Sequence, residues 1–175
     1  MSENYGLQEH GLQGADGTAL RRWHTSLDEQ RGMRAQLRRV DKPEEVLMTE
    51  AFAHFLQRVP ASWRTEQQLM ASALVAAILP WVKTDDVGRS FASQLKGHEE
   101  RPLMSEMRFK QLLKSRTPEE FYRRLLRAVR LLDGKVNLLS LTADILQWYR
   151  EFYQGPERNP VNRLAVKWAR DYYAA

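Results

Sequence analysis

The chain has 175 residues, of which 43% are hydrophobic, so it is long enough for one domain or two small domains with a packed core. It contains no cysteine, which excludes disulfides, thiolate metal sites and a cysteine nucleophile and is consistent with a reducing compartment. The net charge of +5 favours polyanions as partners, and because we find neither a signal core nor an apolar run that spans a bilayer, we expect a cytoplasmic protein with no membrane contact.

Helical periodicity runs through almost the whole chain, and no segment shows the alternation of a β-strand bounded by hairpin turns. Pro43, Thr117-Pro118 and Asn159-Pro160 mark three helix starts, because proline is tolerated at the first helical position and threonine and asparagine cap the residues after them. The sequence therefore predicts an all-α protein. The expected helices are residues 18–29, 31–39, 43–59, 65–79, 87–95, 105–114, 118–133, 138–153 and 160–173.

Two small helical bundles joined by a short linker are the predicted architecture. Residues 1–17 contain four glycines among polar residues and no sustained periodicity, which indicates a flexible N-terminal segment. The stretch from Gly97 to Pro102 reads as a linker between the bundles. We therefore expect an N-terminal helical bundle over residues 18–100 and a C-terminal helical bundle over residues 101–175.

Basic residues are concentrated in two blocks of the chain. Residues 21–42 hold seven basic and three acidic residues, and residues 101–135 hold ten basic and four acidic ones. Residues 43–66, which lie between these two blocks, carry a net charge of −2. This clustering on particular helices is what a surface for nucleic-acid phosphates requires.

The first basic block contains a helix with two distinct faces, from Arg31 to Arg39. At 100° per residue, Met33 and Leu37 fall on an apolar side, while an arginine row occupies another. Guanidinium groups match phosphate oxygens well, although such a row can equally be a solvated helix face. The candidate phosphate-binding residues here are Arg31, Arg34, Arg38 and Arg39.

The second basic block supplies a longer arginine row on the predicted helix from Pro118. Phe121, Leu125 and Ala128 form its apolar side, and the basic residues lie opposite. A solvated face with salt bridges is the alternative, but this block has few acidic residues for pairing. The candidate nucleic-acid-binding residues here are Arg108, Lys110, Lys114, Arg123, Arg124, Arg127 and Arg130, and Arg116 lies between them.

Motifs of catalysis and cofactor binding are not found in the sequence. The four histidines are scattered without an HExxH pattern, and Asp85-Asp86 is better explained as a helix cap than as a Mg²⁺ site. Phosphate-binding glycine loops and a GxSxG serine are absent. We expect no enzyme activity, no cofactor and no metal. Of the five tryptophans, Trp23, Trp81, Trp148 and Trp168 fit apolar core positions, and Trp63 is the least certain.

The order of several motifs resembles the CasB family, the small subunit of the type I-E CRISPR Cascade complex. The resemblance runs from about Thr18 to near the C-terminus. Its strongest marker is Arg-Gly-Met-Arg-Ala-Gln-Leu-Arg-Arg from Arg31, followed by Gly-Arg-Ser-Phe-Ala from Gly88, Met-Ser-Glu-Met-Arg-Phe from Met104, and Arg123-Arg124-Leu125.

This resemblance implies a non-catalytic, all-α subunit of an antiviral surveillance complex. Its partners would be the Cascade backbone and large subunits, the crRNA-containing complex, a second copy of itself and the displaced single-stranded DNA of the R-loop. The family's arginine positions carry over to Arg31, Arg34, Arg38, Arg39, Arg108, Arg123, Arg124 and Arg127. The leading hypothesis is that these basic faces hold the displaced strand. In the alternative, the arginines contact neighbouring protein subunits; a free DNA-binding regulator ranks last, because no Asn or Gln cluster opens a basic helix.

Overall fold

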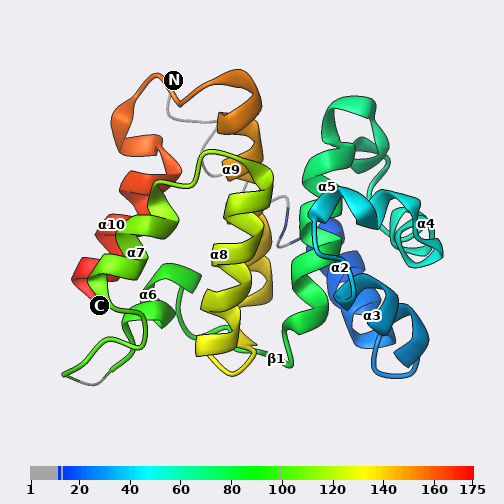
Figure 1. The fold of residues 1–175 in the computed structure, drawn as a ribbon, viewed down its shortest axis with the longest axis horizontal. Helices are drawn as coiled ribbons and strands as arrows, with labels where there is room; N and C mark the ends of the chain where they lie inside the picture. Colours follow the sequence, from blue (N-terminus) through cyan, green and yellow to red (C-terminus); the bar gives the residue numbers. More distant parts are fainter. Residues whose placement is uncertain (1–11, 13, 99) are drawn as a thin grey trace. The chain divides into compact units, whose positions relative to one another are not determined.

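The computed structural model describes residues 12, 14–98 and 100–175 of the chain. Helices form most of this part, which confirms the all-α prediction, and two strands of two residues each were not expected. The predicted flexible segment, residues 1–17, lies mostly outside the described residues, but α2 already begins at Ala15. Figure 1 shows the order of the elements.

The chain divides into two compact units, with the division between Pro80 and Trp81. The sequence-based boundary near residue 100 lies about one short helix later. The reason for the difference is that α6 (Phe91–Lys96) packs against α10 (Leu164–Ala174), so the segment after Trp81 belongs with the second unit. We describe each unit by itself.

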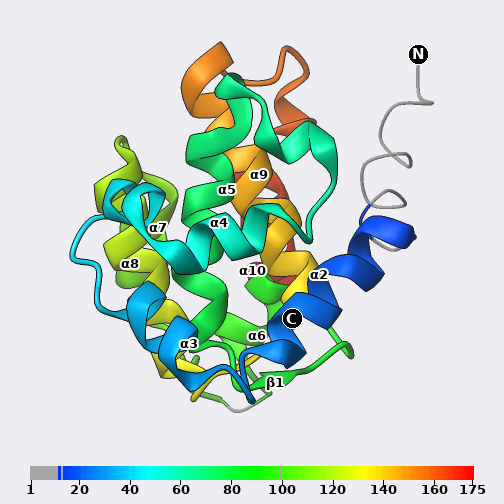
Figure 2. The same cartoon turned by 90° about the vertical axis from the view of Figure 1, so that its right-hand side faces the viewer.

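The first unit is organised around α5, in which every residue from Ala71 to Ile78 is buried. Trp23 and Phe55 meet edge to face with ring centroids 4.6 Å apart, and Trp63 is also buried. In Figure 2, α4 lies across α5. The elements are α2 (Ala15–Ser26), α3 (Arg31–Arg38), the 3-10 helix η1 (Pro43–Met48), α4 (Glu50–Leu56), the 3-10 helix η2 (Ala61–Arg64), α5 (Glu66–Ile78) and the 3-10 helix η3 (Leu79–Trp81), whose last residue already belongs to the second unit.

The predicted helix over residues 43–59 is two elements instead of one. Thr49 adopts an extended backbone between η1 and α4, and its hydroxyl accepts a hydrogen bond from the backbone N–H of Phe52 at 3.1 Å. A threonine at this position caps a new helix more readily than it continues an old one. The prediction of one continuous helix was therefore wrong at Thr49.

The second unit contains four long or medium helices whose starts are capped by side chains. Thr117 accepts from the backbone N–H of Glu120 at 3.1 Å and Asn137 from that of Ser140 at 3.1 Å, and both caps follow the pattern that favours helix starts. The elements are β1 (Thr84–Asp85), α6, α7 (Glu106–Leu113), α8 (Pro118–Leu131), β2 (Lys135–Val136), α9 (Leu138–Gln154), the 3-10 helix η4 (Pro160–Asn162) and α10.

The two short strands pair in parallel, with Thr84 opposite Lys135 and Asp85 opposite Val136. The Asp85 carboxylate accepts a hydrogen bond from the backbone N–H of Leu138 at 3.0 Å. It therefore serves as a helix cap, as predicted, but the helix is α9, which the sequence did not indicate. Gly134 has a positive φ of 71°, and a Cβ at that position would lie 3.0 Å from the carbonyl oxygen of Trp81. Glycine is therefore required at the turn into β2.

Aromatic rings fill the core of the second unit. Phe109 stacks on Tyr172 with ring centroids 4.0 Å apart, and the Tyr172 hydroxyl donates to the backbone carbonyl of Met104 at 2.6 Å. Trp168 is buried, whereas Trp148 and Trp81 are only half-buried. The expectation of core positions thus holds fully for Trp23 and Trp168 and only in part for Trp81 and Trp148.

Candidate nucleic-acid interface

Helix α3 carries the first group of predicted phosphate-binding arginines. Leu37 is fully buried and fixes which side of the helix faces the core. Residues at i and i+4 lie above one another on a helix, so Arg34 and Arg38 share a face. Arg31 and Arg39 are exposed at the two ends of the same helix.

Arg34 and Arg38 both bind the backbone carbonyl oxygen of Pro80. Nε of Arg34 donates to this oxygen at 3.0 Å, and Nε and Nη2 of Arg38 donate to it at 2.9 and 2.6 Å. Arg34 also pairs with the Asp28 carboxylate through Nη1 at 2.8 Å. The carbonyl lies at the C-terminal end of the α5 and η3 segment, where helices leave carbonyl groups without helical partners.

Burial, and to a smaller extent the charge of Arg34, lowers the pKa of the Arg38 guanidinium from its usual value. The direction agrees with a side chain partly withdrawn from water beside a like charge. Arginine remains protonated in proteins, so Arg38 keeps its charge and its donors. Within the first unit, Arg34 and Arg38 thus act as a clasp on Pro80, a role that the sequence analysis missed.

Arg31 and Arg39 differ from the clasp in their surroundings. Both side chains are exposed, and neither has a hydrogen bond or an ion pair with any residue that the structure describes. Their guanidinium groups can therefore meet a polyanion without breaking a protein contact. Of the four predicted residues in α3, the structure leaves these two accessible.

Arg124 joins α7 to α8 in the second unit. Its Nη1 donates to the backbone carbonyl of Gln111 at 2.8 Å and approaches the Ser115 hydroxyl at 3.3 Å, while Nη2 pairs with Glu120 at 2.7 Å. Glu120 in turn accepts from the backbone N–H of Arg116 at 2.8 Å. These contacts satisfy the C-terminal end of α7 and the first turn of α8, so Arg124 is a packing residue.

Two other predicted cations each form an exposed ion pair with a carboxylate one turn earlier in the same helix. Nη2 of Arg123 lies 2.8 Å from the Glu119 carboxylate, and Nζ of Lys110 lies 2.8 Å from the Glu106 carboxylate. Exposed pairs of this kind contribute little to stability, because water screens both charges. The acidic residues of this block thus do pair with it, but weakly enough for a phosphate to compete.

Glu106 is held by two donors, Lys110 and the hydroxyl of Tyr173, which donates to Oε1 at 2.8 Å. Hydrogen bonds from Lys110 and then Tyr173 lower the pKa of the Glu106 carboxyl, and the same contact raises the pKa of the Lys110 ammonium. Both shifts favour the charged pair. The hydrogen bond from Tyr173 connects α7 to the C-terminal end of α10.

The remaining predicted cations of the second unit lie on its surface. The Arg130 guanidinium sits over the Trp81 ring, 4.4 Å from its centroid, which is cation–π geometry. In the described part of the chain, no side-chain partner is found for three other exposed cations. These are Arg108, Lys114 and Arg127.

The structure therefore sorts the eleven predicted residues into three kinds. Three are bound to backbone carbonyls, three are in exposed and exchangeable contacts, and five are exposed without a partner among the described residues. The first kind is Arg34, Arg38 and Arg124; the second is Lys110, Arg123 and Arg130; the third is Arg31, Arg39, Arg108, Lys114 and Arg127.

The described residues, taken by themselves, offer neither a metal site nor a membrane span. No group of three His, Asp or Glu side chains there is arranged to hold a metal ion. None of the helices in that part of the chain is both long and apolar enough to cross a bilayer.

Comparison with known proteins identifies the family. The family model of CRISPR-associated protein Cse2 matches residues 33–173, which include most of α3 and all but the last two residues of the second unit. The chain belongs to the Cse2 family. CasB is another name for Cse2, so the resemblance in the sequence analysis is confirmed.

The chain is 33% identical over 114 residues to the CRISPR-associated protein Cse2 of Thermus thermophilus. The matched region is 65% of this chain and 61% of that relative, so the match spans less than two thirds of the relative's length. No solved structure matches the chain.

Proposed function

We propose that this Cse2-family protein is a small subunit of the CRISPR Cascade complex in antiviral defence, and that it holds the displaced DNA strand of the R-loop by its phosphates. Base pairing reads the target sequence in RNA-guided recognition, and strand exchange is nearly balanced in free energy. A sequence-independent grip on the displaced strand would therefore favour the open R-loop.

The observation that carries the proposal is the exposed set of cations on α7 and α8. Arg108, Lys114 and Arg127 make no side-chain contact with a described residue, and Arg123 is in an exchangeable pair. Contacts between such side chains and phosphates carry no sequence information. This matches a partner whose sequence varies from target to target.

The proposal is tested by measuring the affinity of the full chain for mixed-sequence single-stranded DNA by fluorescence anisotropy over a salt series. The test variant is Arg123→Gln with Arg127→Gln, and the control is Arg170→Gln, an exposed arginine on α10 of the same unit. Each lost phosphate contact should flatten the slope of log affinity against log salt by about 0.7, so two lost contacts should flatten it by about 1.4.

The expected result is weaker binding with a flatter slope for the double variant, and wild-type behaviour for Arg170→Gln. Unchanged affinity and slope in the double variant would refute the assignment of this face to DNA. The alternative function, an assembly subunit whose arginines meet neighbouring subunits, predicts instead that the double variant fails to co-purify with the Cascade backbone subunits, the large subunit or its second copy before any DNA is added.

A further inference from the structure

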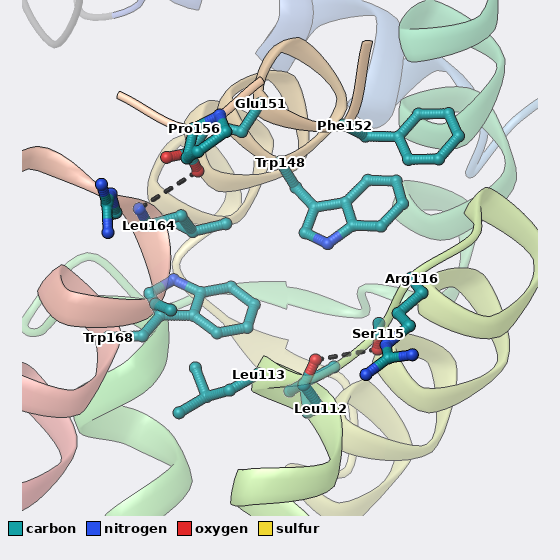
Figure 3. A pocket seen from close by; sticks show the side chains of 12 residues that line it. Leu112, Leu113, Ser115, Arg116, Trp148, Glu151, Phe152, Pro156, Leu164 and Trp168 are labelled. Atoms are coloured by element: carbon teal, nitrogen blue, oxygen red, sulfur yellow. Dashed lines mark hydrogen bonds between the residues drawn. The ribbon is translucent and has the colours of Figure 1, made fainter. Parts of the chain in front are cut away.

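A pocket of about 340 Å³ lies within the second unit, between the C-terminal end of α7, the end of α9 and the start of α10 (Figure 3). This volume falls at the lower end of the range of about 300 to 1,000 Å³ that small-ligand sites occupy. The family relationship and the basic helix faces do not account for it. Its lining residues are Leu112, Leu113, Ser115, Arg116, Trp148, Glu151, Phe152, Pro156, Arg163, Leu164, Ala165 and Trp168.

Aromatic rings held in fixed planes form one wall of the pocket. Phe121, which does not line the pocket, stacks on Trp148 with ring centroids 4.2 Å apart and planes within 1°. It therefore covers one face of the Trp148 ring and helps to fix its plane. Phe152 lies 5.4 Å from Trp148 with planes within 6°, and it is 46% exposed. Trp148 and Phe152 thus line the pocket with parallel, pre-oriented aromatic rings, of which Phe152 is the more exposed.

The pocket also presents hydrogen-bond donors. Figure 3 shows the indole nitrogen of Trp148 turned into the pocket, and no hydrogen bond joins it to a described residue. Arg116 is exposed at the rim, and only its backbone N–H is engaged, by Glu120. Arg163 donates through Nε to the carbonyl of Glu157 at 3.1 Å, so its orientation is fixed.

The one carboxylate in the lining is already engaged with the backbone. Glu151 accepts from the backbone N–H of Leu164 at 3.2 Å and from that of Glu157 at 3.5 Å, which caps the start of α10. The pocket is thus apolar and aromatic inside, with positive charge at its rim.

We infer that this pocket binds an unpaired nucleobase of the single strand, with the adjoining phosphate on Arg116. A base supplies a flat ring for Trp148 and Phe152 and carbonyl or ring-nitrogen acceptors for the indole N–H, and its phosphate supplies the anion for the rim. An aliphatic side chain of a partner protein would leave the Arg116 guanidinium and the Trp148 indole N–H without partners. Because paired bases are stacked inside the duplex, only single strands can enter. The inference rests on the proposed function, and it adds a base contact to the phosphate contacts.

The experiment compares two fluorescein-labelled oligonucleotides of equal length and charge, one of thymidines and one with abasic sites at every position except the ends. The test variant is Ala165→Trp, which fills the pocket from an exposed position on α10 without removing a core side chain. The matched control is Val166→Trp, the next residue on the same helix, which is also exposed and does not line the pocket. Circular dichroism and the midpoint of thermal unfolding test whether both variants fold.

We expect wild type and Val166→Trp to bind the thymidine strand about tenfold more tightly than the abasic strand, because base stacking on aromatic side chains contributes at this scale. Ala165→Trp should lose that preference and keep wild-type affinity for the abasic strand. Equal affinity of wild type for the two strands would overturn the inference. The proposed phosphate contacts would still stand in that case if the affinity keeps its dependence on salt concentration. Ala165→Trp with an intact thymidine preference would also overturn it, and a loss of Cascade assembly in that variant would assign the pocket to a protein partner.

Discussion

Removing the donors of the clasp on Pro80 should destabilise the first unit, whereas removing the exposed arginines of the same helix should not. Arg34→Met and Arg38→Met keep an apolar side chain of similar length and remove the guanidinium, so the stem packing is largely preserved. The three hydrogen bonds to the Pro80 carbonyl are 2.6 to 3.0 Å long, and Pro80 is buried.

The magnitude follows from the number of partners left to the carbonyl. A hydrogen bond to a charged donor contributes about 1.5 to 3 kcal/mol, and a buried acceptor without a partner costs about 1 to 3 kcal/mol. In either single variant one arginine still donates to Pro80, so we expect a loss of about 1 kcal/mol. The double variant leaves the carbonyl without either, and we expect a loss of about 3 kcal/mol, which exceeds the sum of the single losses.

Urea unfolding followed by circular dichroism measures these losses as a double-mutant cycle. Arg31→Met with Arg39→Met is the matched control on the same helix, and we expect a change within about 0.5 kcal/mol. The affinity for DNA should respond in the opposite way: it should fall in the Arg31→Met, Arg39→Met variant and not in the clasp variants. The reasoning would be refuted if the control pair destabilised the protein as much as the clasp pair, or if the clasp variants showed no coupling.

Three further predictions concern single positions. Gly134→Ala should destabilise the protein by more than about 1 kcal/mol in thermal unfolding, because the position has a positive φ and the added Cβ would meet backbone atoms. Gly32→Ala in α3 should instead stabilise the protein by about 0.5 to 1 kcal/mol, because a Cβ added there would meet no neighbouring group within 4 Å. Tyr172→Phe should cost about 1 to 2 kcal/mol in urea unfolding, because the Met104 carbonyl loses its donor. Glu106→Gln should lower the unfolding midpoint at pH 7 but not below about pH 4, because a carboxyl whose pKa is lowered on folding stabilises only above its unfolded pKa and loses that effect as the pH falls through the folded value.

Local sequence signals predicted most of the helices, since these signals act within one turn. Thr117 with Pro118 places the start of α8 correctly, and Asn137 and Ser105 cap their helices through the third residue beyond them. The break at Thr49 carries the same kind of signal, a threonine followed by a glutamate, but the apolar pattern on both sides of it is continuous and hid the cap.

The strands and the unit boundary depend on distant residues and were not predictable from local pattern. Each strand has two residues, too few for alternation to be visible, and Thr84 pairs with Lys135 across 51 positions of sequence. The short helix α6 precedes the predicted linker, but its partner is α10, at the far end of the chain. Nothing in residues 91–96 alone indicates that partner.

The candidate site was predictable in composition but not in the use of each residue. The sequence motif does not distinguish among its four arginines, Arg31, Arg34, Arg38 and Arg39. The two that form the clasp differ from the exposed pair only because they reach the Pro80 carbonyl, which lies 42 residues beyond Arg38. A guanidinium fork serves a carbonyl and a phosphate by the same geometry, so periodicity cannot tell the two uses apart.

The difference between cations that bind backbone carbonyls and cations that are accessible limits how strongly salt can act on DNA binding through these helices. A phosphate can replace Glu119 beside Arg123 at little cost, whereas drawing Arg124, Arg34 or Arg38 to a phosphate would leave backbone carbonyls without their donors. Eight of the eleven predicted cations therefore remain for phosphates, and with about 0.7 per contact the slope of log affinity against log salt cannot exceed about 6 in magnitude for one chain that uses this set. A titration of the full chain with single-stranded DNA measures that slope. A steeper value would show that cations outside α3, α7 and α8 also meet the strand.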